Sequence, residues 1–158
     1  MSPWGKAKPA RGGRPLDVGY RALASDPAWV CQAKIDGWRA VWDGDALRTR
    51  SGKPIRIPPQ VRDALPAGVV LEGEWEPTRG RLWLFDAPTH PGTLRERWAA
   101  LQGLFCASEC VQPIPHGVTW DQVEPHGWEG VVWKRLDSRY PCAGVTWDWI
   151  KYRAEWLR

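Results

Sequence analysis

Apolar and polar residues alternate along most of the chain after Trp29, and this pattern predicts β-strands. Short runs rich in Trp, Val and Leu are separated by turn residues such as Asp36-Gly37 and Asp43-Gly44-Asp45, an arrangement typical of antiparallel hairpins. The strands predicted in this way are 29–35, 38–42, 46–50, 69–75, 81–86, 111–114, 130–135 and 146–152.

Two segments carry helical signals. Residues 59–65 form a short helix that Pro66 would end. A second helix begins at Thr93, because Thr93 and Glu96 make a capping box and the apolar residues that follow recur at helical spacing up to Gly103. Strands in hairpins with few helices predict the α+β class, with two antiparallel sheets and flanking helices.

Length and charge limit the organisation of the chain. Its 158 residues are enough for one domain. Residues 1–15 are basic and rich in Gly and Pro, so we expect a flexible arm there and the folded domain over 16–158. The formal net charge of +4 permits a nucleic-acid partner without demanding one. We expect a monomer with no membrane span and no signal peptide, hence a cytoplasmic location.

The hexapeptide Lys34–Arg39 is the first candidate for chemistry. A lysine ends an apolar strand, a tight Asp-Gly turn follows, and an arginine comes next. A half-buried lysine loses its proton more easily and becomes a nucleophile, and an arginine can grip a phosphate. Taken alone, such a hexapeptide is usually an ordinary surface turn.

Further charged residues lie on the other predicted strands. Glu72 and Glu74 share one strand face, Glu129 precedes an apolar strand, and Lys151 and Arg153 share a face of the last strand. Carboxylates for Mg²⁺, cations for phosphate and a separate nucleophilic lysine are the groups that nucleotidyl transfer requires.

Five segments in order resemble the successive motifs of covalent nucleotidyltransferases, the superfamily of polynucleotide ligases and mRNA capping enzymes. They are KIDGWR, LEGEW, LWLFDAP, WEGVVWKRLDSRYP and WDWIKYR. The last two are most similar to those of bacterial and phage ATP-dependent DNA ligases. The resemblance implies the catalytic adenylation domain of a ligase that forms lysyl-AMP and seals 5′-phosphate/3′-hydroxyl breaks in DNA during repair or replication.

The resemblance also implies residue roles. Lys34 would be the nucleophile, Asp36 would help activate the 3′-hydroxyl, and Glu129 would organise Mg²⁺, with Mn²⁺ as an alternative ion. The nucleotide-binding residues would be Gln32, Arg39, Arg50, Glu74, Phe85, Lys134, Lys151 and Arg153. In this set, Phe85 would stack on adenine, and Lys151 and Arg153 would contact the α-phosphate.

The chain departs from the family pattern at several points. Gln32 stands where the family usually has Glu, and Arg153 stands where it usually has Lys. No OB-fold domain follows Arg153 in this sequence. This leaves open a piece of a longer protein, a minimal enzyme, or an OB-fold domain or repair partner acting in trans. The short segment before Lys34 favours ATP over NAD as the nucleotide donor.

Two other interpretations remain. The chain could be an RNA ligase or a capping-type guanylyltransferase, which would use the same lysine chemistry. It could also be a non-catalytic module that binds DNA ends or nicks, although a binding module has no need of a nucleophilic lysine. In each case the expected partner is nucleic acid, and for the ligase it is nicked or broken duplex DNA.

Overall fold

The computed structural model describes residues 3–157 and divides the chain into two compact units. The first unit combines the residues up to Lys6 with Gly37–Ile114, and the second combines Ala7–Asp36 with the residues from Pro115 on. Residues 1, 2 and 158 lie outside the described part, and so do the corresponding ends of the predicted arm and domain. Neither unit corresponds to the predicted domain 16–158, because each unit combines two separate stretches of the chain.

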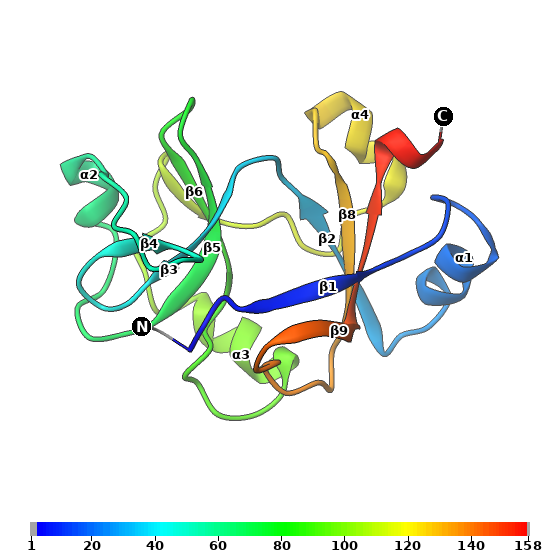
Figure 1. Cartoon of the computed structure of the whole chain (residues 1–158), viewed down its shortest axis with the longest axis horizontal. Helices are drawn as coiled ribbons and strands as arrows, with labels where there is room; N and C mark the ends of the chain where they lie inside the picture. Colours follow the sequence, from blue (N-terminus) through cyan, green and yellow to red (C-terminus); the bar gives the residue numbers. More distant parts are fainter. Residues whose placement is uncertain (1–2, 158) are drawn as a thin grey trace. The chain divides into compact units, whose positions relative to one another are not determined.

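The first unit is built on a sheet of order β4-β3-β5-β6-β7 (Figure 1). Its strands are β3 (Trp38–Trp42), β4 (Leu47–Thr49), β5 (Leu71–Glu76), β6 (Arg81–Asp86) and β7 (Val111–Pro113), and its helices are α2 (Pro59–Arg62) and α3 (Leu94–Leu101). The hairpins β3–β4 and β5–β6 are antiparallel, as predicted. β7 joins β6 in parallel, because α3 lies between them in sequence and carries the chain back.

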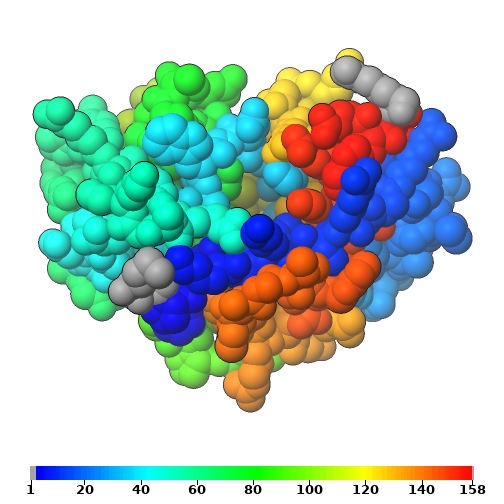
Figure 2. All heavy atoms as spheres, viewed as in Figure 1, coloured from blue at the N-terminus to red at the C-terminus, as the bar shows by residue number. Residues whose placement is uncertain are grey.

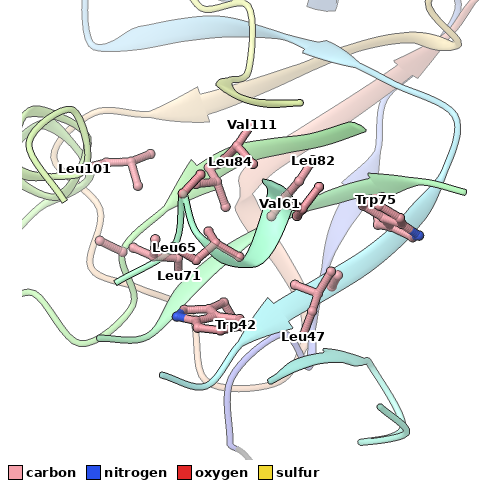
Figure 3. Packing of buried hydrophobic residues seen from close by; sticks show 13 residues of the cluster. Trp42, Leu47, Val61, Leu65, Leu71, Trp75, Leu82, Leu84, Leu101 and Val111 are labelled. Carbon is pink, nitrogen blue, oxygen red and sulfur yellow. The ribbon is translucent and has the colours of Figure 1, made fainter. Parts of the chain in front are cut away.

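One face of this sheet carries the core of the first unit. Alternate strand residues such as Trp42, Leu71 and Leu84 are buried together with Val61 and Leu101 from the helices (Figure 3). Because side chains alternate between the faces of a sheet, the intervening residues of β3, β5 and β6 point to the opposite face. Arg39, Glu72 and Glu74 lie on that opposite face.

Helix α3 is fixed by polar contacts at its start and along its length. Thr93 and Glu96 form the predicted capping box, which satisfies backbone N–H groups at the helix start. Arg97 is fully buried and donates to both carboxylate oxygens of the equally buried Asp86 on β6, over 2.8 and 3.3 Å. This bidentate pair ties the helix to the sheet.

The second unit has a sheet of order β1-β9-β8-β2. Its strands are β1 (Ala7–Arg11), β2 (Trp29–Lys34), β8 (Gly130–Arg135) and β9 (Gly144–Arg153). Its helices are α1 (Val18–Ala24) and α4 (Val123–His126), with 3₁₀ turns η1 (Trp120–Gln122) and η2 (Ala154–Leu157). On one face of the sheet, Tyr20 from α1 packs edge-on against Trp120, Trp133 and Tyr152, forming a separate aromatic core.

The prediction of a flexible arm is wrong for residues 7–11, which form β1. This strand pairs in parallel with β9, and Ala7 and Ala10 are buried with 0% and 1% exposure. Figure 2 shows β1 in blue beside β9, which runs from orange to red. The small alanines fit a close strand pairing, while the basic residues Lys8 and Arg11 are exposed. Each of the two predicted sheets is therefore present, with one parallel pair in each.

Two other local features differ from the prediction. The Asp36-Gly37 turn does not join a hairpin, because β2 pairs with β8 while β3 pairs with β4 and β5. Helix α1 was not predicted, although Asp17 caps it by accepting from the Tyr20 N–H over 2.8 Å. Within residues 3–157, no helix is long and apolar enough to span a membrane.

Candidate active site

The face of the second sheet opposite its aromatic core carries most of the predicted site residues. Lys34 lies opposite Gly130, and Gly130 lies opposite Arg153 on the next strand. Gln32 and Lys151 lie opposite the same residue of β8. Residues directly opposite each other share a face. Strand register therefore gathers two rows of polar side chains over β2, β8 and β9.

Glu129 is the carboxylate at the centre of the first row. Its Oε2 contacts the Lys34 Nζ, and its Oε1 contacts an Arg153 guanidinium nitrogen. The backbone fixes this position, since the Glu129 N–H donates to the Lys34 carbonyl over 2.8 Å and the Glu129 carbonyl accepts from Ala154 over 2.9 Å. The Lys34 side chain is 24% exposed, so it stays accessible while held by Glu129.

The close pairing of β8 with β9 requires a glycine at position 130, directly after Glu129. A Cβ at this position would lie 2.0 Å from the Tyr152 carbonyl oxygen of β9. Any larger residue would push β8 away from β9. The close approach is therefore part of what sets Glu129 between the ends of β2 and β9.

The group formed by Lys34, Glu129, Lys151 and Arg153 has an excess of positive charge. Burial lowers the pKa of Lys151, and the neighbouring positive charges of Lys34 and Arg153 lower it further. Glu129 and the exposed Glu155, which lies 3.3 Å from the Arg153 Nε, offset only part of that charge. Such a surface favours an anion with several oxygens, such as a phosphate chain.

Gln32 is 1% exposed and contacts His116. The Gln32 Nε2 lies 3.1 Å from the His116 Nδ1. Burial lowers the pKa of His116 to about 4, and the positive charge of Lys134 contributes. The imidazole is consequently neutral near pH 7.

The two remaining predicted residues of this unit lie in different surroundings. Lys134 is 3% exposed, and its Nζ sits 4.5 Å from the centroid of the Trp149 ring. Asp36 is exposed and lies two residues after the end of β2. A direct nucleotide contact by Lys134 and a catalytic role of Asp36 both stay predictions.

The first unit holds a second group of predicted residues, on the sheet face opposite its core. Arg39 lies opposite Glu74 in the β3–β5 ladder and donates to the fully buried Glu72 over 2.8 Å. The Arg39 guanidinium also lies 5.8 Å from the centroid of the Phe85 ring. Arg39 thus supplies a cation to Glu72, and it lies across the ladder from Glu74 on the face that the two carboxylates share.

Arg50 is held by backbone atoms of the N-terminal segment. Its guanidinium donates to the carbonyl oxygens of Gly5 and Lys6 over 3.1 and 3.0 Å. These hydrogen bonds hold the guanidinium beside Lys6. Its contact with a phosphate remains a prediction.

Sequence reasoning missed two members of these groups. Glu72 was seen as a charge beside Glu74, but its ion pair with Arg39 was not assigned; the alternation in β5 was the available signal. His116 was assigned to a loop without a role, and nothing in the sequence connects it to Gln32, which is 84 residues away.

Glu129 is the residue predicted to organise a metal ion, and its carboxylate contacts Lys34 and Arg153. No group of three or more His, Cys, Asp or Glu side chains suited to a metal occurs in the part of the chain that the structure describes. One carboxylate together with phosphate oxygens and water is a common way to hold Mg²⁺, so the residues fit a metal that arrives with a nucleotide.

Comparisons with known proteins give a consistent likeness. No protein-family model matches the chain. The multifunctional non-homologous end joining protein LigD of Mycobacterium bovis is 28% identical over 162 aligned positions, covering 78% of this chain. The chain spans 21% of the length of that relative.

Solved structures extend the likeness to the fold. A Lig E DNA ligase, described as binding DNA with a minimal scaffold, matches with a TM-score of 0.70 at 20% identity, over 92% of this chain and 68% of its own. A mycobacterial DNA ligase D complexed with ATP and MES matches with a TM-score of 0.62 at 22% identity, over 94% of this chain and 60% of its own. The chain has the fold of a ligase-type nucleotidyltransferase domain.

Proposed function

We propose that the chain is the adenylation domain of an ATP-dependent DNA ligase, with Lys34 as the residue that receives AMP. The observation that carries the proposal is the pair of ion pairs that Glu129 makes with Lys34 and Arg153, with Lys151 on the same sheet face as Arg153. A nucleophilic amine next to a carboxylate and two further cations is suited to attack on a phosphate ester. The fold and the likeness to LigD support the same activity.

The first step joins AMP to Lys34. The Lys34 nitrogen attacks the α-phosphorus of ATP, an N–P bond forms, the bond to the bridging oxygen breaks, and pyrophosphate leaves. The ammonium must first lose its proton, since only the neutral amine has a lone pair. Glu129 contacts the ammonium directly and is the group positioned to accept that proton.

Lys151 and Arg153 act on the charge that develops during this attack. Oxygens on the α-phosphorus gain negative charge as the nucleophile approaches, and fixed cations nearby lower the barrier. A Mg²⁺ or Mn²⁺ ion bound to Glu129 and the phosphates would add further charge neutralisation. Arg153 is pre-oriented by Glu129, so little reorganisation is required of it.

The residues of the first unit would serve the nucleoside and the DNA. Phe85 offers an aromatic face for adenine, Glu74 a carboxylate for the ribose, and Arg39 and Arg50 cations for phosphates. In the later steps AMP passes to a DNA 5′-phosphate, and a 3′-hydroxyl, with Asp36 nearby, displaces it. Nicked or broken duplex DNA in repair is the proposed substrate, and a monomer the proposed form.

The test is incubation of the purified protein with α-labelled ATP and Mg²⁺, followed by denaturing electrophoresis. We expect a labelled band with wild type, none with Lys34→Arg, and an undiminished band with Lys53→Ala. Lys34→Arg keeps the positive charge beside Glu129 but lacks an amine that can attack, and Lys53 is an exposed lysine in the loop after β4.

The outcomes separate the interpretations. Label on Lys34→Arg would contradict the assignment of the nucleophile. Stronger label from GTP than from ATP would indicate capping chemistry instead. If wild type takes no label and also fails to seal a nicked duplex carrying a pre-adenylylated 5′-phosphate, the adenylation-domain proposal is wrong.

A further inference from the structure

The first residues of β9 expose two large apolar side chains to solvent. Trp147 is 67% exposed and Val145 is 63% exposed. Among the residues that the structure describes, the Trp147 indole has no ring, cation or hydrogen-bond partner. Exposed apolar side chains that adjoin one another mark a place of contact with another molecule more often than isolated ones do.

The ladder between β1 and β9 is irregular where Trp147 lies. Thr146 and Ile150 are the partners of consecutive β1 residues, so residues 147–149 of β9 have no partner on β1. Trp149 within this stretch is 2% exposed, whereas Trp147 projects into solvent. Such irregularities in a ladder redirect a side chain, and here the redirected side chain is an indole.

A cation without a carboxylate partner stands next to the two apolar side chains. Lys8 of β1 lies opposite Val145 in the parallel ladder and is exposed. Within residues 3–157, no carboxylate forms an ion pair with Lys8. Beyond the effect of burial, Lys8 is among the positive charges that lower the pKa of Lys151. The positive field around Lys151 therefore extends to Lys8.

Trp147 and Lys151 lie on one face of β9. Side chains alternate along a strand, and the two residues are four positions apart, about 13 Å along an extended strand. Figure 2 shows the start of β9, in orange, at the surface next to β1, in blue. An aromatic ring in line with cations is the combination that binds single-stranded nucleic acid, because phosphates meet the cations while unpaired bases stack on the ring.

We propose that Trp147 is a stacking platform for an unpaired base of a single-stranded DNA end, with Val145 extending the apolar surface and Lys8 holding an adjoining phosphate. The faces of bases inside a duplex are covered by their neighbours, so the platform favours ends that carry unpaired nucleotides over fully paired DNA. The inference rests on the proposed function, because DNA is the polymer proposed to reach the group around Lys34. It adds the kind of DNA end that the chain holds.

The test compares two DNA probes by fluorescence anisotropy in the absence of ATP. Each is a labelled hairpin duplex with a single-stranded overhang that carries either adenine bases or abasic sites, which keep the phosphates and remove the bases. We expect wild type to bind the adenine overhang about tenfold more tightly, the worth of one base stacked on an aromatic ring. Trp147→Leu, which is apolar without being aromatic, should bind both probes equally, and Trp147→Phe should keep most of the preference.

Two further variants separate stacking from charge and from a general change of surface. Lys8→Ala should weaken the binding of both probes alike and lower the slope of log affinity against log salt concentration by about 0.7, which corresponds to one phosphate contact on a single strand. Val18→Ala shortens an 86% exposed apolar side chain in α1 of the same unit, and it should leave the preference for the adenine overhang unchanged.

The remaining outcomes overturn the inference or separate it from the proposed function. It is wrong where wild type binds both overhangs equally or Trp147→Leu keeps the preference. A wild-type dimer in sedimentation velocity that Trp147→Leu abolishes assigns the surface to a second copy of the chain instead. Labelling of Lys34 without an overhang preference rejects the inference and leaves the proposed function standing. A Trp147-dependent preference in a protein whose Lys34 takes no label supports the inference and counts against the proposed function.

Discussion

At the scale of single residues, Glu129 has the most demanding position in the candidate site. It contacts both Lys34 and Arg153, and backbone bonds on either side hold it between them. In the proposed reaction this one carboxylate would offset charge, accept a proton and offer an oxygen to a metal. Removing the charge therefore tests all three roles together.

Glu129→Gln keeps the shape and removes the charge and the proton acceptor. We expect the single-turnover rate of AMP transfer at saturating ATP and Mg²⁺ to fall by about a hundredfold or more, the usual contribution of general-base catalysis. Quench-flow measurement beside Glu124→Gln, an exposed carboxylate in α4, gives the comparison. An equal rate in Glu129→Gln and wild type would remove Glu129 from the reaction.

His116 is expected to make the stability of the folded protein depend on pH. Its pKa is about 4 in the folded protein against 6.5 as an ordinary value, so between these limits the unfolded chain binds a proton that the folded chain does not. Stability from this residue is therefore present above pH 6.5 and is lost as the pH falls toward 4. Urea unfolding across this window should show a steeper loss in wild type than in His116→Asn. The same dependence of stability on pH in both proteins would contradict a lowered pKa of His116 in the folded state.

At the scale of elements, local signals were enough to predict hairpins but not distant pairings. β3–β4 and β5–β6 are adjacent in sequence and joined by turn residues, and both are present as predicted. β1 was missed because its partner β9 begins more than a hundred residues later, and five residues with two alanines carry little alternation of their own. α1 was missed because its seven residues place one buried side chain, Tyr20, on the core.

The pairing of β1 predicts slow amide exchange where an arm would exchange at once. The strand pairs with β9, and the Gly12 N–H donates to the Lys151 carbonyl over 2.9 Å. Hydrogen–deuterium exchange with mass spectrometry should show peptides over residues 7–12 protected to a degree similar to peptides over 148–152. Complete exchange of 7–12 within seconds would restore the flexible arm.

At the scale of the whole chain, the ordered motifs predicted residues that the structure places near one another, whereas the division into two units was not predicted. The ordered motifs pointed to Lys34, Glu129, Lys151 and Arg153, and the structure gathers these four on one sheet face. The units could not be predicted, because the second one is made of two stretches separated by the first. Periodicity is a property of neighbouring residues and says nothing about which distant stretches share a core.

The two cores share no residue, so a cavity in one should leave the other closed. Cys31 reports on the second core, because it is 2% exposed and burial raises the pKa of its thiol to about 12. Reaction of Cys31 with a thiol reagent therefore requires that core to open. We expect Val131→Ala, in the second core, to speed Cys31 labelling by about tenfold or more, since truncating a buried side chain leaves a cavity.

Leu84→Ala is the matched change in the first core. It should cost about 2–5 kcal/mol of stability there and leave the rate of Cys31 labelling within about twofold of wild type. Labelling followed by peptide mass spectrometry distinguishes Cys31 from the exposed Cys106 and Cys142. Equal acceleration of Cys31 by both variants would mean that the chain opens as a single cooperative body. The group around Lys34 would then depend on packing throughout the chain, and loss of activity in a first-unit variant would say nothing about direct contact with the nucleotide.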